Sequence, residues 1–251
     1  DTYTVIAPTT IDGPSSVDTG GTLENQSELT NDGTLTNAGV LTNAGTFSIM
    51  AGSQVTGVGT ITQSAGTLTV NGDMTQSAVT INGGTLAGNG TITSPVTVNN
   101  ATVSAGVSPL TAGTLNIVGD LDVLGASTLM FELGGPSAYD MIDVFGTATI
   151  ADGTIFDVDF LGGYAATVGS IFDLLIADSI VADLSTFAFD FADAAGVSWT
   201  TSLFTFEDSN QSIRLTASAL SVSAVPLPAT LPLMLAGMVG FGWMSRRRKR
   251  A

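Results

Sequence analysis

Apolar residues recur at every sixth position in the first part of the chain. Leu23, Leu29, Leu35, Leu41 and Phe47 share one phase, and asparagine and then glycine follow at fixed positions within each six-residue unit. Because six is even, an extended chain returns these apolar side chains to one face, whereas a helix leaves successive positions about 120° apart. The pattern therefore predicts short strands, with asparagine and glycine, which tolerate left-handed backbone, at the turns.

A longer period follows. Gly66-Thr67-Leu68 recurs as Gly84-Thr85-Leu86 and then as Ala101-Thr102-Val103. The first of these spacings equals three of the six-residue units, and the second is one position shorter. Both periods therefore fit a coil of about three short strands per turn, each pairing in parallel with the strand one turn below. The sequence predicts an all-β fold, a parallel β-solenoid that buries Leu, Ile and Val and exposes strand edges only at its ends. The spacing leaves the handedness open.

Longer apolar segments replace the repeats after about Ser127. They read as strands, because β-forming residues are punctuated by Gly, Asp and Ser. Acids alternate with large apolar residues, as in 156–160, which places the acids on a solvated face. We expect the last turns and a β-rich cap here, with a small joined β-sandwich as the alternative. The expected strands are Thr128–Leu133, Met141–Ile150, Thr154–Leu161, Ser170–Ala177, Thr186–Phe191, Ser198–Phe206 and Ile213–Ala217.

These patterns divide the chain into five parts. Residues 1–22 are expected to be an N-terminal cap or lead-in, and residues 23–125 the solenoid repeats. Residues 126–216 form the β-rich terminal turns or cap, and residues 217–224, small and polar, a linker. Residues 225–251 hold a short motif, an apolar segment and a basic tail.

The C-terminal part combines three elements in a fixed order. The motif Val225, Pro226, Leu227, Pro228, Ala229 precedes an apolar run, and the basic cluster Arg246, Arg247, Arg248, Lys249, Arg250 follows it. Residues 227–245 carry no charge and would extend roughly 28 Å as a helix, close to the ~30 Å hydrocarbon core of a bilayer. We expect one transmembrane helix, with the basic cluster in the cytoplasm and the rest of the chain outside.

This order of elements resembles the PEP-CTERM class of bacterial sorting signals, in its Val-Pro-Leu-Pro-Ala variant. The resemblance implies that an exosortase, a cysteine-dependent, transpeptidase-like membrane enzyme, recognises and cuts the tail. The protein would then pass from the inner membrane to the cell envelope or the extracellular matrix. Leu227 stands where the commoner form has glutamate. A plain anchor, holding a periplasm-facing protein in the membrane, is the alternative.

The body resembles the β-helical passenger regions of autotransporter-type surface proteins. The segments that carry this resemblance are 84–92, 113–121 and 139–144. It implies a right-handed coil, which is typical of those regions. An exported chain needs an export signal, so we expect either that a leader has been removed before Asp1 or that the sequence is a fragment.

The amino-acid composition excludes several kinds of catalytic and metal site. The chain has no Cys and no His, which excludes disulfides, Cys/His zinc sites, thiol nucleophiles and His-based triads. Arg214 is the only Lys or Arg in residues 1–245, against 22 acids in the chain, so we expect no nucleic-acid partner. We expect Arg214 on an exposed strand beside Glu207 or Asp208, and Trp199 on a partly buried strand.

Carboxylates are what remains for catalysis, and paired carboxylates support glycoside hydrolysis. A β-helix enzyme acting on polysaccharide is therefore an alternative function, although adjacency in sequence is weak support and we expect no catalytic residue. The acids also attract calcium, but the sequence lacks an EF-hand loop and the nonapeptide of calcium-binding rolls. We expect diffuse, weak Ca²⁺ association and no cofactor or defined metal site. The candidate pairs are Asp120 with Asp122, Asp140 with Asp143, and Asp157 with Asp159.

Threonines recur as Thr-x-Thr, a spacing that places both hydroxyls on one strand face. Flat arrays of this kind order water in some ice-binding solenoids, but Thr is also a good former of any exposed strand, and we favour that interpretation. The pairs are Thr34/Thr36, Thr60/Thr62, Thr67/Thr69 and Thr91/Thr93.

The sequence as a whole predicts an exported, non-enzymatic bacterial surface or matrix protein with a structural or adhesin-like role. Its expected partners are the exosortase-like enzyme, the membrane and exopolysaccharide or other surface chains. Weak contacts repeated along a stiff body would add through multivalency, with divalent cations bridging neighbouring chains.

Overall fold

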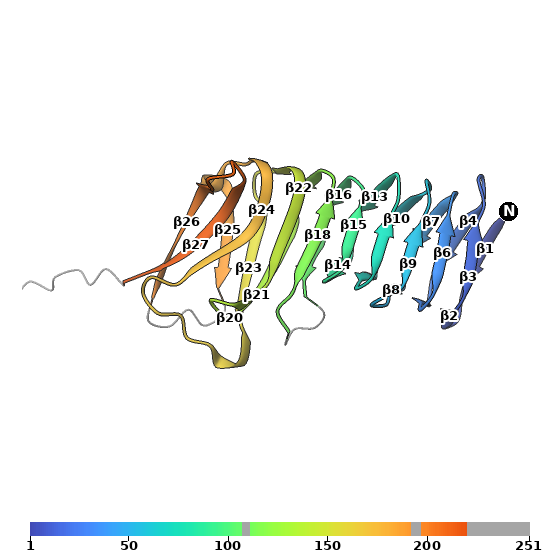
Figure 1. Cartoon of the computed structure of the whole chain (residues 1–251), viewed down its shortest axis with the longest axis horizontal. Helices are drawn as coiled ribbons and strands as arrows, with labels where there is room; N and C mark the ends of the chain where they lie inside the picture. The colour runs from blue at the N-terminus through green and yellow to red at the C-terminus, as the bar shows by residue number, and fades with distance from the viewer. Residues whose placement is uncertain (107–110, 192–196, 220–251) are drawn as a thin grey trace, which may run out of the picture. The chain divides into compact units, whose positions relative to one another are not determined.

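The computed structural model describes residues 1–106, 111–191 and 197–219. Residues 1–219 form one compact unit in which short strands are stacked from β1 to β27 (Figure 1). The first six turns of this stack contain three short strands each. Their strands are β1 (Thr2–Val5), β2 (Thr9–Ile11), β3 (Pro14–Val17), β4 (Thr22–Asn25), β5 (Glu28–Asn31), β6 (Thr34–Asn37), β7 (Val40–Asn43), β8 (Thr46–Ile49), β9 (Gln54–Thr56), β10 (Thr60–Gln63), β11 (Thr67–Val70), β12 (Asp73–Thr75), β13 (Ala78–Ile81), β14 (Thr85–Gly88), β15 (Thr91–Thr93), β16 (Val96–Asn99), β17 (Thr102–Ala105) and β18 (Thr114–Val118).

Each strand from β1 to β17 pairs in parallel with the strand three places later in the chain. Three stacks result, which we call the first (β1, β4, β7 and onward), the second (β2, β5, β8 and onward) and the third (β3, β6, β9 and onward). Thr67 pairs with Thr85, and Thr85 with Thr102, at the spacings of the second repeat. The all-β prediction is confirmed, and the mostly parallel pairing is that expected of a β-solenoid.

The apolar positions of the six-residue period are the core of the early turns. Leu23 and Leu41 lie in the first stack, Leu29 and Phe47 in the second and Leu35 in the third, and none is more than 6% exposed. The predicted even spacing therefore places one large apolar side chain on the inner face of each strand.

The asparagines of the same repeat do not lie at turns, as we had expected from their tolerance of left-handed backbone. Each ends a strand and is buried, two residues after the core leucine and therefore on the same inner face. Their amides form hydrogen bonds from one turn to the next: Asn25 Nδ2 donates to Asn43 Oδ1 at 2.7 Å, and Asn43 Nδ2 donates to Gln63 Oε1 at 3.0 Å. Among the described non-glycine residues, only Asn100 and Ser209 have positive φ.

The repeat glycines are needed for close approach. A Cβ at Gly39 would collide with the carbonyl oxygen of Gly21, and one at Gly45 would collide with the carbonyl oxygen of Ser27. Both collisions are with the backbone of the turn below. Glycine at these positions therefore lets successive turns stack closely.

The later turns are longer and less regular. Their elements are β19 (Leu121–Leu124), β20 (Thr128–Gly135), β21 (Ala138–Tyr139), β22 (Met141–Ile150), β23 (Ile155–Phe160), η1 (Leu161–Gly163), β24 (Ile171–Val181), η2 (Leu184–Thr186) and β25 (Ala188–Phe191). β22 pairs with both β18 and β19, so one long strand joins the first and third stacks. β20 turns back into β21 as an antiparallel hairpin.

The chain then changes from parallel to antiparallel pairing. β27 (Gln211–Ser218) pairs antiparallel with β24, and β26 (Ser198–Thr205) pairs antiparallel with β27. Aromatic rings pack beneath these strands, where Trp199 stacks on Phe191 with ring centroids 5.6 Å apart. Trp199 is partly buried, as predicted, and a strand is found at each of the seven segments expected after Ser127.

Candidate functional site

The predicted sorting segment lies outside the described residues. This applies to the motif Val225–Ala229, to the expected transmembrane helix and to the basic cluster Arg246–Arg250. Among the residues that the structure does describe, no helix is long and apolar enough to cross a membrane. The candidate sites that remain are the carboxylates of the later turns, the recess at the first turn and the threonine rows.

The structure separates one of the three predicted carboxylate pairs, Asp140 and Asp143. Asp140 is fully buried beside the β20–β21 hairpin, whereas Asp143 lies on the outer face of β22. The pKa of Asp143 is raised by burial and then by the charge of Asp178, not by Asp140. Asp120 is exposed before β19 and accepts a hydrogen bond from the Thr147 amide at 2.8 Å, while Asp122 is partly buried on β19.

The third pair, Asp157 and Asp159, does share the outer face of β23, as alternation predicts. Both are partly buried, and Val158 between them is buried in the core. Burial raises the pKa of Asp157 most, followed by the charges of Asp159 and Asp190. These outer-face acids are therefore close enough to repel one another.

The most perturbed acid is one that sequence reasoning missed. Glu132 on β20 is 8% exposed and pairs in register with Asp159 of β23. Burial, and then the charges of Asp140 and Asp159, raise its pKa to about 7. The register brings Glu132 and Asp159 together from successive turns, at an interval longer than either repeat of the sequence.

Both carboxylate oxygens of Asp140 accept hydrogen bonds from backbone amides. Its Oδ1 accepts from the Gly113 amide at 2.8 Å, and its Oδ2 accepts from the Glu132 amide at 3.0 Å. Burial raises the pKa of Asp140 to about 6, although these two hydrogen bonds act in the opposite direction. The carboxyl group therefore ties the start of β18 to the hairpin.

No three acidic side chains of the described residues converge closely enough to hold a metal ion. Glu132 and Asp140 are instead neighbouring acids with raised pKa values, and the charge of Asp159 adds to the shift at Glu132. A carboxyl group that is neutral near pH 7 beside an ionised one is also the arrangement of a general acid and its partner.

Arg214 lies on a strand, as predicted, but its expected exposure and its expected partners, Glu207 or Asp208, were wrong. It lies on β27 and pairs with Asp173 of β24, with Nε 2.8 Å from Oδ1 and Nη2 3.0 Å from Oδ2. The Arg214 side chain is only 17% exposed, and its guanidinium stacks on Phe204, 3.4 Å from the ring centroid. The antiparallel pairing of β24 with β27 brings this partner from 41 residues away, so a neighbour in sequence was the wrong choice.

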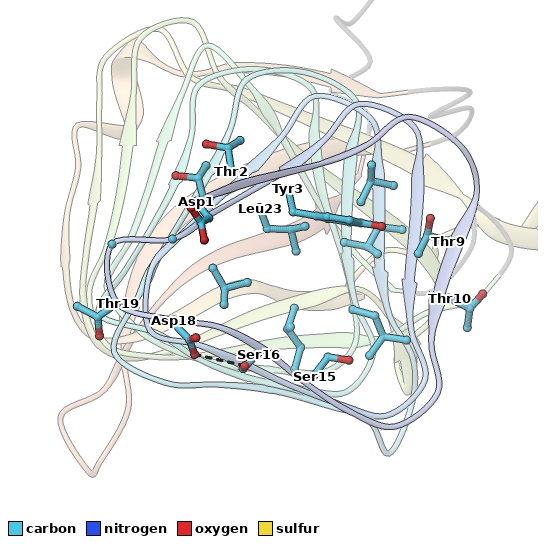
Figure 2. Close-up of a pocket in the computed structure, with 18 of the residues that line it drawn as sticks. Asp1, Thr2, Tyr3, Thr9, Thr10, Ser15, Ser16, Asp18, Thr19 and Leu23 are labelled. Atoms are coloured by element: carbon cyan, nitrogen blue, oxygen red, sulfur yellow. Dashed lines mark hydrogen bonds between the residues drawn. The ribbon is translucent and has the colours of Figure 1, made fainter.

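A recess of about 750 Å³ opens at the first turn (Figure 2). The first turn carries hydroxyl side chains where the next turn carries core leucines: Tyr3 pairs with Leu23, Thr9 with Leu29 and Ser15 with Leu35. Figure 2 shows Tyr3 lying across the opening, and Ser16 donating to Asp18 at 3.3 Å. The recess therefore has an apolar floor and a rim of hydroxyl and carboxyl oxygens.

The four Thr-x-Thr pairs do not form one array. Thr60/Thr62 lie in the first stack, Thr67/Thr69 in the second, and the other two pairs in the third. The outer face of the second stack nevertheless carries a continuous row, in which each member pairs in register with the next. Its members are Thr46, Thr67, Thr85, Thr102 and Thr128.

Comparison with known proteins bears on the C-terminal segment. A search of curated proteins finds no significant match to the chain. A family model described as the PEP-CTERM protein-sorting motif matches residues 224–249, which include the predicted motif and most of the basic cluster. Such signals are recognised by exosortase-type enzymes and direct export to the cell envelope or beyond. The chain thus carries a PEP-CTERM protein-sorting motif at residues 224–249.

Proposed function

We propose that the protein is a non-enzymatic structural or adhesin-like component of the bacterial surface or extracellular matrix. The observation that carries the proposal is the sorting motif at 224–249, attached to a body of stacked parallel strands. The motif supports the destination, and the body supports the role, since stacked turns present similar outer faces repeatedly along their length.

The proposed mechanism is geometric. Rows such as Thr46, Thr67 and Thr85 repeat one polar contact from turn to turn, and weak contacts to exopolysaccharide or other surface chains add through multivalency. Exposed acids of the early turns, such as Asp32 and Asp73, attract divalent cations, which bridge neighbouring chains. Calcium acts here as a diffuse bridge between molecules, and the proposal includes no resident cofactor.

The route to the surface is the second part of the proposal. Residues 227–245 hold the chain in the inner membrane for a short time, with the basic cluster in the cytoplasm. An exosortase-like enzyme then cuts at or near Val225–Ala229 and releases the body. The intermediate is a membrane-anchored precursor.

The intact mass of the protein from its native cells, measured in each cell fraction, tests this route. We expect the mature chain outside the inner membrane to lack the residues that follow the 225–229 region. A full-length chain that remains in the inner membrane would contradict the proposal and make the segment a plain anchor.

Light scattering of the purified protein tests the role. We expect clustering on addition of Ca²⁺ in the millimolar range and reversal by a chelator. NaCl at the same ionic strength is the control, because a monovalent cation does not bridge two chains. Indifference to calcium would remove the bridging step. Release of reducing ends or unsaturated products from acidic glycans would overturn the non-enzymatic assignment.

A further inference from the structure

Glu132 is a buried carboxyl group with an incomplete set of hydrogen bonds. Its side chain is 8% exposed, and within the described residues its Oε2 has no hydrogen-bond partner. Buried polar atoms in folded proteins almost always have a partner, and an ionised carboxylate needs one most. The environment of Glu132 therefore favours the protonated form.

The elements around Glu132 add negative charge. β23 contributes Asp159 in register with Glu132, and Asp157 lies beside it on the same face. The hairpin contributes Asp140, whereas the Tyr139 phenol interacts with Asp173 and Arg214 instead. Met130 of β20 and Ser104 of β17, which pair in register, do not titrate. The single Arg of residues 1–219, Arg214, is already paired with Asp173.

We propose that Glu132 and Asp140, with Asp159 as a neighbouring charge, form a proton-binding cluster that stabilises the later turns in mildly acidic medium and loosens them as the medium becomes alkaline. The cluster adds a pH response to the proposed surface protein, and it does not depend on that function being correct. The Asp140 carboxyl is the mechanical link, because it holds the amides of Gly113 and Glu132. Ionised Glu132 repels the carboxylate that holds these two strands together.

The sign of the effect follows from the direction of the shifts. The pKa of Glu132 rises to about 7 and that of Asp140 to about 6, both chiefly through burial. The folded chain therefore binds these protons more tightly than the unfolded chain. The stability is fully present below the ordinary carboxyl range and is lost as the pH rises through 6 and 7.

Thermal unfolding of the purified full-length chain at pH 5.5 and pH 8.0, followed by circular dichroism, tests the proposal. We expect the Tm of the wild type to fall by about 5 °C between the two values. Glu132→Gln, which keeps the shape without the charge, should remove most of this fall and should have the higher Tm at pH 8.0. Asp73→Asn, which removes an exposed acid of β12, is the matched control and should leave the fall unchanged.

A local measurement on the wild type covers the case in which Glu132→Gln folds poorly. Hydrogen exchange, corrected for its intrinsic pH dependence, should show the Gly113 and Glu132 amides losing protection between pH 5.5 and 8.0, while β10 and β11 keep theirs. Equal protection at both pH values, or an equal fall in Tm in Glu132→Gln, would overturn the proposal. A Tm at pH 8.0 that Ca²⁺ restores in the wild type alone would also overturn it, because the cluster would then be a metal site.

Discussion

The turns from β1 to β15 repeat one another, whereas those from β18 onward do not. In the early turns each strand has three or four residues, and the interval along the chain between paired residues varies little from turn to turn. In the later turns this interval is longer, strands reach eleven residues, and a hairpin and an antiparallel pair enter the sheets. The two regions show that one coil can be maintained by two different sets of interactions.

In the early turns the interactions are repeated and local. One apolar side chain per strand and a chain of buried amides recur from turn to turn, so each turn is stabilised mainly by its neighbours. The later turns depend on features that occur once, among them the aromatic stack, the Asp140 carboxyl and the Arg214–Asp173 pair. The loss of stability caused by a substitution should therefore have a different origin in each region.

The largest effect is expected in the aromatic stack of the later turns. Phe156 is fully buried and stacks on Phe131, Phe187 and Phe189, so Phe156→Ala should destabilise the protein by about 3–5 kcal/mol. Chemical unfolding gives the free energy, and Phe145→Ala, on a ring that is 54% exposed, is the control with a small expected effect. Similar losses in both variants would show that the stack does not hold the later turns together.

A somewhat smaller effect is expected from the buried amide chain of the early turns. Asn43→Ala removes the bonds to Asn25, Gln63 and the Thr67 carbonyl and leaves buried polar atoms unpaired, which should cost about 2–3 kcal/mol. Gln54→Ala, on an exposed side chain of β9, should cost less than about 0.5 kcal/mol in the same unfolding assay. A loss below about 1 kcal/mol for Asn43→Ala would mean that solvent replaces the amide bonds.

The third effect is expected from the Arg214–Asp173 ion pair, which joins β27 to β24. Arg214→Ala leaves Asp173 partly buried without its cation and should cost about 2 kcal/mol. Arg214→Lys keeps the charge but not the two-point geometry, so it should recover less than half of the loss. A double-mutant cycle with Asp173→Asn measures the coupling, and additive losses would mean that Arg214 stabilises these antiparallel strands through Phe204 alone.

What could be predicted from the sequence follows the same division. The phase of Leu23 to Phe47 recurs over successive units that are neighbours in the sequence, so the strands and their inner faces were predicted correctly. The burial of Asn43 could also have been predicted, because Asn43 lies two residues after Leu41 and therefore on the same face of the strand. The turn propensity of asparagine and this parity predict different places for Asn43, and the place expected from turn propensity was wrong.

The later turns contain no comparable local signal. The strands after Ser127 could be predicted because β-forming residues are enriched in each, but their partners could not. Glu132 meets Asp159 through the register between strands of successive turns, and Arg214 meets Asp173 only because the sheet changes to antiparallel pairing. Neither contact is periodic, so the candidate site that depends on them became visible only in the structure.

The smallest effect on stability is expected on the outer face of the early turns. Substitutions there can show whether the outer threonines stabilise the fold or contact a partner. Thr67 lies partly exposed on the outer face of β11, directly before the fully buried Leu68. Thr67→Val should change the free energy of unfolding by less than about 0.5 kcal/mol, whereas Leu68→Ala should cost about 3 kcal/mol. If the threonine rows make the contacts of the proposed adhesin, the paired change Thr67→Val and Thr85→Val should weaken binding to exopolysaccharide in a sedimentation assay at unchanged Tm. Unchanged binding would show that the contact surface lies outside the second stack. A lowered Tm would show that these hydroxyls stabilise the fold.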